Sequence, residues 1–130
     1  MAPVTRTAAV LAWIAGLGFG LPGAYGAAYL ARHAEVWSFH GYPTYGGGPF
    51  ESWGLPTLLM QMGFVLVCAA ELITGNLLWL RRPAGRTLSL ALLPVEVFFW
   101  VGFALPFGFV LGALRAALAL APLPAQAEAP

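Results

Sequence analysis

Two long apolar runs occupy the first two thirds of the sequence, and a segment of different character separates them. The first covers residues 7–31 and the second covers residues 55–80. As a helix with a rise of about 1.5 Å per residue, the first run would reach roughly 37 Å, which exceeds the ~30 Å hydrocarbon core of a bilayer. A reading of this run as a cleaved secretory signal is weaker, because the apolar stretch continues well past a candidate cleavage site near Ala24.

The third apolar run, residues 87–121, is too long for one transmembrane helix. As a single helix it would reach roughly 52 Å. Pro106 disfavours helix at the residue before it, so we expect a break there and two spans, residues 88–104 and 107–121. One long kinked helix is the alternative. The pattern therefore predicts an all-α fold, a four-helix transmembrane bundle.

The segments between the runs differ in character. Residues 32–53 form an exterior loop that is rich in glycine, proline and aromatic residues, and we expect no regular helix there. Aromatic rings prefer the depth of the lipid headgroups, where such a loop would lie. Residues 81–86 form a basic turn, and residues 122–130 form a Pro/Ala-rich tail that we expect to be disordered.

Composition strengthens the membrane assignment. Hydrophobic residues make up 60% of the chain and charged residues only 8%, whereas soluble domains are about one quarter charged. All the basic residues are arginines and all the acidic residues are glutamates, a bias typical of GC-rich bacterial genomes. There is no basic patch for nucleic acid, and the single cysteine excludes an internal disulfide.

Arginine placement predicts the orientation. Cytoplasmic segments next to transmembrane helices carry an excess of positive charge. With both termini in the cytoplasm of a plasma membrane, only Arg32 lies outside, and five arginines lie at or near the cytoplasmic face: Arg6, Arg81, Arg82, Arg86 and Arg115.

Small residues recur at every fourth position of the first run. They are Ala8, Ala12, Gly16, Gly20, Ala24 and Ala28. Such a ridge allows two helix backbones to approach closely within a membrane. We expect this helix to pack within the bundle, against a second copy of the chain, or against another membrane protein.

Two carboxylates lie within apolar spans and form the candidate functional site. Glu71 and Glu96 each lie ten residues from the basic turn, so they should share a depth near the middle of the bilayer. An ionised group there costs at least about 2.5 kcal/mol and is normally neutralised or paired. The expected neighbours on the same helix faces are Cys68, Thr74, Ser89 and Trp100. The pair predicts a proton, cation or ligand site, with a purely structural pair as the alternative.

Other polar residues give no catalytic or cofactor signature. His33 and His40 flank the exterior loop with Glu35 and Glu51, but their spacing is not that of a metal site. We therefore expect no metal and no cofactor. Gln61 and Asn76 are expected to form hydrogen bonds between helices or at the headgroups.

The segments 40–51 (HGYPTYGGGPFE) and 99–107 (FWVGFALPF) are similar to those of uncharacterised small actinobacterial four-helix integral membrane proteins. This resemblance implies an architecture and no activity. The leading functional hypothesis is a non-enzymatic interaction or accessory subunit. The alternatives are a small transporter or proton-coupled permease that uses Glu71 and Glu96, and a lipid- or sterol-binding protein or enzyme.

Overall fold

The protein is mainly helical. The computed structural model describes residues 2–39, 42–43, 49–103 and 106–120, and the account below concerns these residues. The long helices are α1 (Ala2–His33), α3 (Thr57–Trp79), α4 (Pro83–Gly102) and α5 (Pro106–Leu120). Three of them, α1, α3 and α4, are long and apolar enough to cross a membrane, which confirms the predicted helical membrane protein.

The described parts of the segment between α1 and α3 contain short regular elements. Strands β1 (Ser38–Phe39) and β2 (Tyr42–Pro43) pair in antiparallel fashion. The four-residue helix α2 (Pro49–Ser52) follows, although we expected no helix in this loop. Proline at the first helical position is tolerated because its missing N–H would have no partner there. The expectation for the three consecutive glycines concerns residues outside the described ranges.

The connection between α3 and α4 is shorter than the predicted turn of residues 81–86. Arg81 adopts a left-handed conformation with φ of 57°, and the Arg82 N–H donates to the Leu77 carbonyl at 2.8 Å. This pattern is a Schellman motif, which satisfies the last carbonyls of a helix. Pro83 then starts α4 at its first position, so Arg86 lies in a helix and not in a turn.

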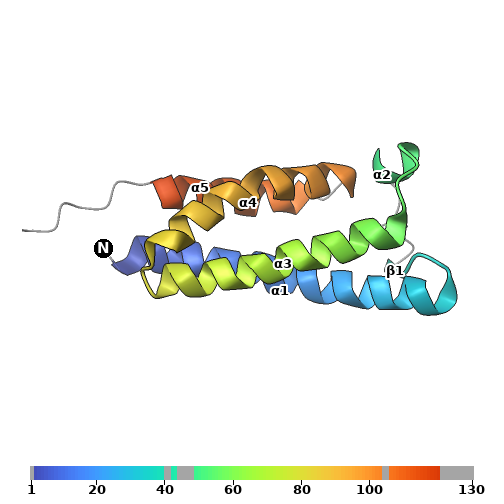
Figure 1. Ribbon diagram of the computed structural model, residues 1–130, viewed down its shortest axis with the longest axis horizontal. Helices are drawn as coiled ribbons and strands as arrows, with labels where there is room; N and C mark the ends of the chain where they lie inside the picture. The colour runs from blue at the N-terminus through green and yellow to red at the C-terminus, as the bar shows by residue number, and fades with distance from the viewer. Residues whose placement is uncertain (1, 40–41, 44–48, 104–105, 121–130) are drawn as a thin grey trace, which may run out of the picture.

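The four long helices form a closed ring of contacts. α1 packs against α3, α3 against α4, α4 against α5, and α5 returns to α1. The N-terminus, the α3–α4 connection and the C-terminal end of α5 lie at the same end of the molecule (Figure 1). We call this the arginine end, after Arg6, Arg81, Arg82 and Arg86. The opposite end carries α2 and is called the aromatic end, after Phe50, Trp53 and Phe103.

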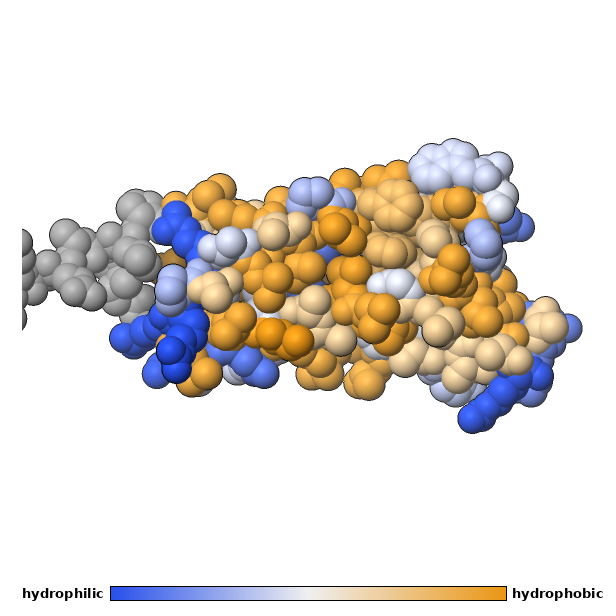
Figure 2. Space-filling view, in the orientation of Figure 1, coloured by the Kyte–Doolittle hydropathy of each residue, from blue (hydrophilic) through white to orange (hydrophobic). Residues whose placement is uncertain are grey.

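The outer surface reverses the distribution of polar and apolar side chains found in soluble proteins. Hydrophilic residues gather at the two ends, and an apolar belt covers most of the face between them (Figure 2). Large apolar side chains such as Leu66 and Leu21 are 71% and 67% exposed. The buried polar side chains are Gln61, Glu71, Thr74, Ser89, Glu96 and Arg115. A lipid environment is the solvent that suits this surface.

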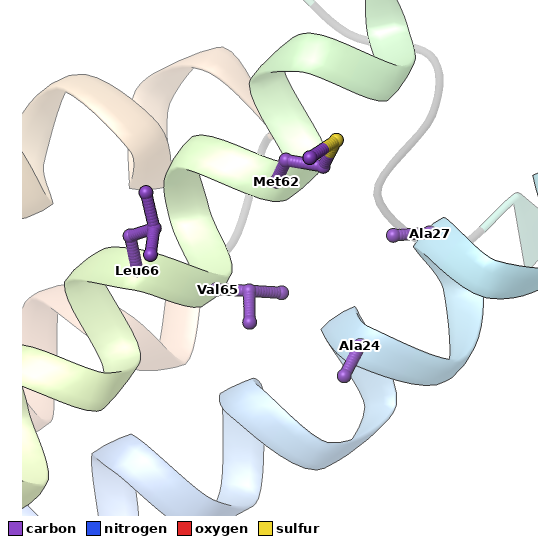
Figure 3. Close-up of a pocket in the computed structure, with 5 residues that line it drawn as sticks. All are labelled: Ala24, Ala27, Met62, Val65 and Leu66. Atoms are coloured by element: carbon purple, nitrogen blue, oxygen red, sulfur yellow. The ribbon is translucent and has the colours of Figure 1, made fainter.

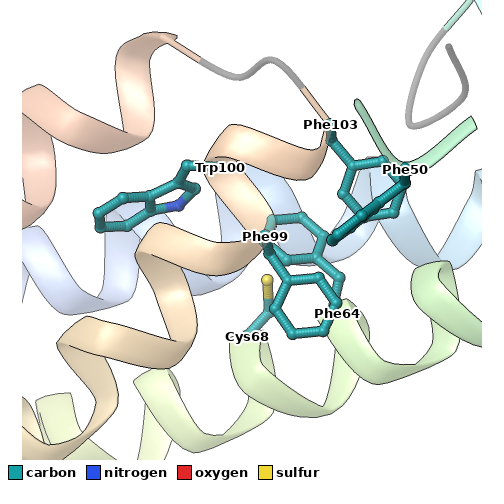
Figure 4. Close-up of a cluster of buried hydrophobic side chains, with 6 residues drawn as sticks. All are labelled: Phe50, Phe64, Cys68, Phe99, Trp100 and Phe103. Carbon is teal, nitrogen blue, oxygen red and sulfur yellow. The ribbon is translucent and has the colours of Figure 1, made fainter. Parts of the chain in front are cut away.

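Aromatic rings fill the bundle toward the aromatic end. Between ring centroids, Phe64 of α3 lies 5.6 Å from Phe99 of α4 and 5.7 Å from Phe103, the residue that follows α4. Phe50 of α2 lies 4.9 Å from Phe103 and closes the cluster (Figure 4). The short helix α2 is thereby anchored on the end of α4.

Close backbone packing joins α1 to α3 toward the arginine end. A Cβ atom added at Gly16 would lie 2.9 Å from the Cys68 carbonyl oxygen, and one added at Gly75 would lie 3.1 Å from the Ala9 carbonyl oxygen. These distances leave no room for a side chain at either position. Glycine on both helices therefore sets how closely α1 and α3 approach.

Candidate functional site

A buried arginine occupies the centre of the bundle. Arg115 is placed by α5, and its side chain is only 1% exposed. The side chains of Glu71 on α3 and Glu96 on α4 are 3% and 2% exposed. The three side chains form what we call the ion triad, which connects α3, α4 and α5.

Glu96 and Glu71 bind the guanidinium in different ways. Arg115 Nη1 donates to Glu96 Oε1 at 2.9 Å, and Nη2 donates to Glu96 Oε2 at 2.6 Å. Both oxygens of Glu96 are thus engaged in a two-point ion pair, the geometry that gives arginine–carboxylate pairs their strength. Glu71 accepts one hydrogen bond, from Arg115 Nη1 to its Oε1.

The backbone of α4 contributes a further acceptor. Arg115 Nη2 also donates to the Ser89 carbonyl oxygen at 3.2 Å. Ser89 lies two helical turns before Glu96, so both residues share the face of α4 that meets α5. The guanidinium is consequently fixed by side chains from two helices and by a main-chain group.

Three buried polar atoms of this site have no hydrogen-bond partner among the described residues. They are Glu71 Oε2, Arg115 Nε and Ser89 Oγ. Buried polar groups are nearly always satisfied, so each exception calls for an explanation. The site therefore has hydrogen-bonding capacity that the ion pairs do not use.

The sequence placed Arg115 at or near the cytoplasmic face, but its side chain is buried within the bundle. Its Cα lies five residues from the end of α5, roughly 8 Å along the axis, so the long side chain could have reached the membrane surface. It extends into the bundle and donates hydrogen bonds to the side chains of Glu71 and Glu96. The sequence contained this signal: in the described chain, Arg115 is the one basic residue surrounded by apolar residues inside a helix.

The other predicted neighbours of the carboxylates divide into two groups. Ser89 joins the triad through its carbonyl oxygen. Thr74 is buried near Glu71 in sequence, but its hydroxyl donates to the Ala70 carbonyl of its own helix at 2.9 Å. Cys68 and Trp100 belong to the aromatic cluster, so they line the apolar space beyond the triad.

Trp100 takes the space left by two glycines of α5. A Cβ atom added at Gly108 would lie 2.4 Å from its ring, and one added at Gly112 would lie 2.2 Å from it. The indole therefore sets the separation of α4 and α5 next to Arg115. Trp100 therefore acts as a spacer between these two helices.

The predicted small-residue ridge of α1 is split between the interior and the surface. Ala12 and Gly16 are buried and Gly20 is partly buried, but Ala24 and Ala28 are exposed. Ala24 and Ala28 therefore do not take part in close packing within this chain, and their packing against a second protein stays a prediction. A step of four residues turns the helix by about 40° beyond a full revolution. The ridge therefore winds away from α3 after a few steps.

A shallow apolar groove opens where α1 and α3 separate. Its volume is about 290 Å³, and its lining consists of Ala24, Ala27, Met62, Val65 and Leu66 (Figure 3). The groove lies on the outside of the bundle. It is separate from the ion triad, whose residues do not line it.

The residues considered for a metal site are not brought together where the structure describes them. His33 packs on Tyr29, with ring centroids 4.4 Å apart, and Glu35 and Glu51 are exposed. His40 lies outside the described residues. Within the described ranges, no three histidine, cysteine or acidic side chains gather as metal ligands would.

Comparisons with known proteins give no relative from which a role could be transferred. No family model matches the chain, and no curated protein or solved structure matches it. The ion triad and the surface of the bundle therefore have to be interpreted from their own chemistry.

Proposed function

We propose that the protein crosses the plasma membrane four times, with both termini in the cytoplasm. α5 is apolar but has only 15 residues, and the ion pairs of Arg115 to α3 and α4 support its place as a fourth span beside them. The distribution of the other arginines between the two ends favours this orientation even when Arg115 is left out of the count. Four of them lie at one end, Arg6, Arg81, Arg82 and Arg86, and Arg32 lies at the other.

Cysteine labelling in intact cells tests the orientation. In a Cys68→Ala background, Glu35→Cys and Ala84→Cys place single thiols at exposed positions near opposite ends of the bundle. We expect a membrane-impermeant maleimide to label Glu35→Cys only. Labelling of Ala84→Cys in place of Glu35→Cys would contradict the proposed orientation.

We further propose that the protein is a non-enzymatic interaction or accessory subunit. The observation that carries this proposal is the closure of the ion triad, whose three side chains are 1–3% exposed. The polar groups within the bundle hold its helices together and are not available to a substrate. Transport through the triad, an alternative from the sequence, would need an opening that the described residues do not provide in this conformation.

An exposed stripe on α1 is the surface that best supports such an interaction. Its members, spaced alternately by four and three residues, are Val10, Ile14, Leu17, Leu21, Ala24 and Ala28. An alternation of four and three residues keeps one face of a helix directed toward a neighbouring helix. Toward the aromatic end the stripe changes from leucine to alanine, which allows closer approach there.

Site-specific crosslinking tests the stripe. In the Cys68→Ala background, we expect Leu21→Cys and Ala28→Cys to form disulfide-linked or adduct bands in native membranes. The matched control is Leu114→Cys, an exposed position on α5, which should give none. Equal crosslinking at all three positions, or a lone monomer in mild detergent with no crosslink at the stripe, would refute an interaction through α1.

The apolar groove favours a second candidate function, the binding of one lipid chain. An acyl chain matches the groove in polarity, because all five lining side chains are apolar. Ala27→Phe would fill the groove, and we expect it to reduce the lipid retained by the purified protein in native mass spectrometry. Leu114→Phe serves as the control, and equal lipid retention in both variants and the wild type would exclude a specific site.

A further inference from the structure

The charges of the ion triad do not balance if all three groups are ionised. Two carboxylates face one guanidinium, which leaves one negative charge in the interior. Among the residues that the structure describes, no other ionisable side chain compensates for it. α1 has none between Arg6 and Tyr25, the remaining basic residues of α3, α4 and their connection lie at the arginine end, and Cys68 would add negative charge if it ionised.

The hydrogen bonds distinguish the two carboxylates. Glu96 uses both oxygens to bind Arg115, as expected for an ionised partner of a guanidinium. Glu71 uses only Oε1, and its Oε2 is buried with no partner among the described residues. A charge shared with an unpartnered oxygen is strongly disfavoured in a low-dielectric interior, whereas a neutral carboxylic acid is tolerated far better.

We propose that the ion triad is a proton-binding site, and that the bound proton is held by Glu71 on Oε2. Glu96 and Arg115 form the ion pair, and Glu71 completes the site as a neutral acid that accepts a hydrogen bond on Oε1. The proton comes from the aqueous phase, and its loss leaves one net negative charge between α3 and α4. Ser89 Oγ and Arg115 Nε supply unused hydrogen-bonding groups at the same site.

Proton binding makes the stability of the bundle depend on pH in a defined direction. The folded protein would hold a proton on Glu71 at neutral pH, where an exposed glutamate has lost it. Because the folded state then binds one proton more than the unfolded state, stability falls as the pH rises. The unfolding equilibrium constant should increase about tenfold per pH unit until Glu71 ionises in the folded protein.

Infrared spectroscopy of the protein in lipid vesicles tests the presence of the proton. We expect the wild type at neutral pH to show the carbonyl stretch of a protonated carboxylic acid, shifted by ¹³C labelling of glutamate. The band should be lost in Glu71→Gln and kept in Glu35→Gln, a control at an exposed glutamate. Absence of the band from the wild type, or its persistence in Glu71→Gln, would overturn the proposal.

Thermal unfolding identifies the carboxylate that holds the proton. Glutamine resembles a neutral glutamic acid, so Glu71→Gln should fold, keep its Tm within about 4 °C of the wild type at neutral pH, and lose the alkaline decrease in Tm. Glu96→Gln should lower the Tm by a larger amount because it removes the two-point ion pair. The reverse order of the two variants, or unfolding of Glu71→Gln at neutral pH, would show that Glu71 is the ionised partner.

Discussion

The two halves of the bundle are held together by different physics. From the middle of the bundle to the arginine end, α1 and α3 meet through glycines, and the ion triad links α3, α4 and α5 by directed hydrogen bonds. Toward the aromatic end, the rings of α2, α3 and α4 pack without such bonds. Charge pairing depends on the number and direction of groups, whereas ring packing depends mainly on volume. We therefore expect the first half to be intolerant of conservative changes and the second to accept them.

Removal of Arg115 should have the largest effect. Arg115→Met leaves both Glu71 and Glu96 buried without a cation, and breaking such a network costs about 3–5 kcal/mol. We expect loss of the folded bundle, measured by thermal unfolding in detergent. Arg115→Lys should also be destabilising because one ammonium cannot reproduce the two-point pair.

A compensated variant provides the control for Arg115→Met. Addition of Glu71→Gln and Glu96→Gln removes the uncompensated carboxylates, so the triple variant should recover a large part of the lost stability. A triple variant no more stable than Arg115→Met alone would show that the loss came from packing and not from charge.

Truncation in the aromatic cluster should have the next largest effect. Phe64→Ala removes a ring that contacts Phe99 and Phe103, and a buried Phe→Ala change costs about 3–5 kcal/mol in soluble cores. A lower value, about 3 kcal/mol, is expected here because lipid can fill part of the space. Phe64→Leu should cost less than about 1.5 kcal/mol. A leucine variant as unstable as the alanine variant would contradict the contrast between the two halves.

A bulkier residue at the α1–α3 contact should have an intermediate effect. Gly16→Val places a side chain against the Cys68 carbonyl and should destabilise by about 1–3 kcal/mol. The matched control is Gly18→Ala, because an added Cβ at Gly18 meets nothing within 4 Å. We expect Gly18→Ala to leave the unfolding temperature unchanged or to raise it, since alanine favours helix more than glycine does.

Loss of a single neutral hydrogen bond should have the smallest effect. Trp13 Nε1 donates to Asn76 Oδ1 at 3.2 Å between α1 and α3. Such bonds between membrane helices contribute about 0.6 kcal/mol on average. We expect Asn76→Leu to shift the unfolding temperature by no more than a few degrees, and a shift as large as that of Arg115→Met would refute the ranking of charge over neutral contacts.

The sequence predicts the helices well and their contacts less well. Apolar runs and Pro106 place the helical segments, because hydrophobic length is a local property of the chain. Whether Glu71 and Glu96 lie close together depends on how α3 and α4 are rotated relative to each other. Whether Arg115 reaches them depends on how α5 packs against these two helices. Two acids in apolar helices predict that a cation lies near them. The sequence does not identify this cation, because the long side chain of an arginine near a helix end can extend either to the membrane surface or into the bundle.

The packing of α1 is a second case in which the sequence predicts a helix but not all of its contacts. Small residues four apart form a line in the sequence, but on a helix of 3.6 residues per turn that line winds around the axis. Ala12 and Gly16 meet α3, and Ala28 faces outward. Spacing alone therefore identified the helix that packs closely and did not identify how far along its length the contact extends.

The burial of Arg115 also imposes an order on biosynthesis. A lone arginine in the middle of a helix opposes membrane insertion by about 2.5–3.5 kcal/mol, and α5 has only 15 residues to offset it. The ribosome delivers α3 and α4 before α5, so both carboxylates are already in the membrane when Arg115 emerges. In the proposed four-span topology, α5 would enter the bilayer by docking on α3 and α4, and a nascent chain that ends before Arg115 would retain two acids without a cation.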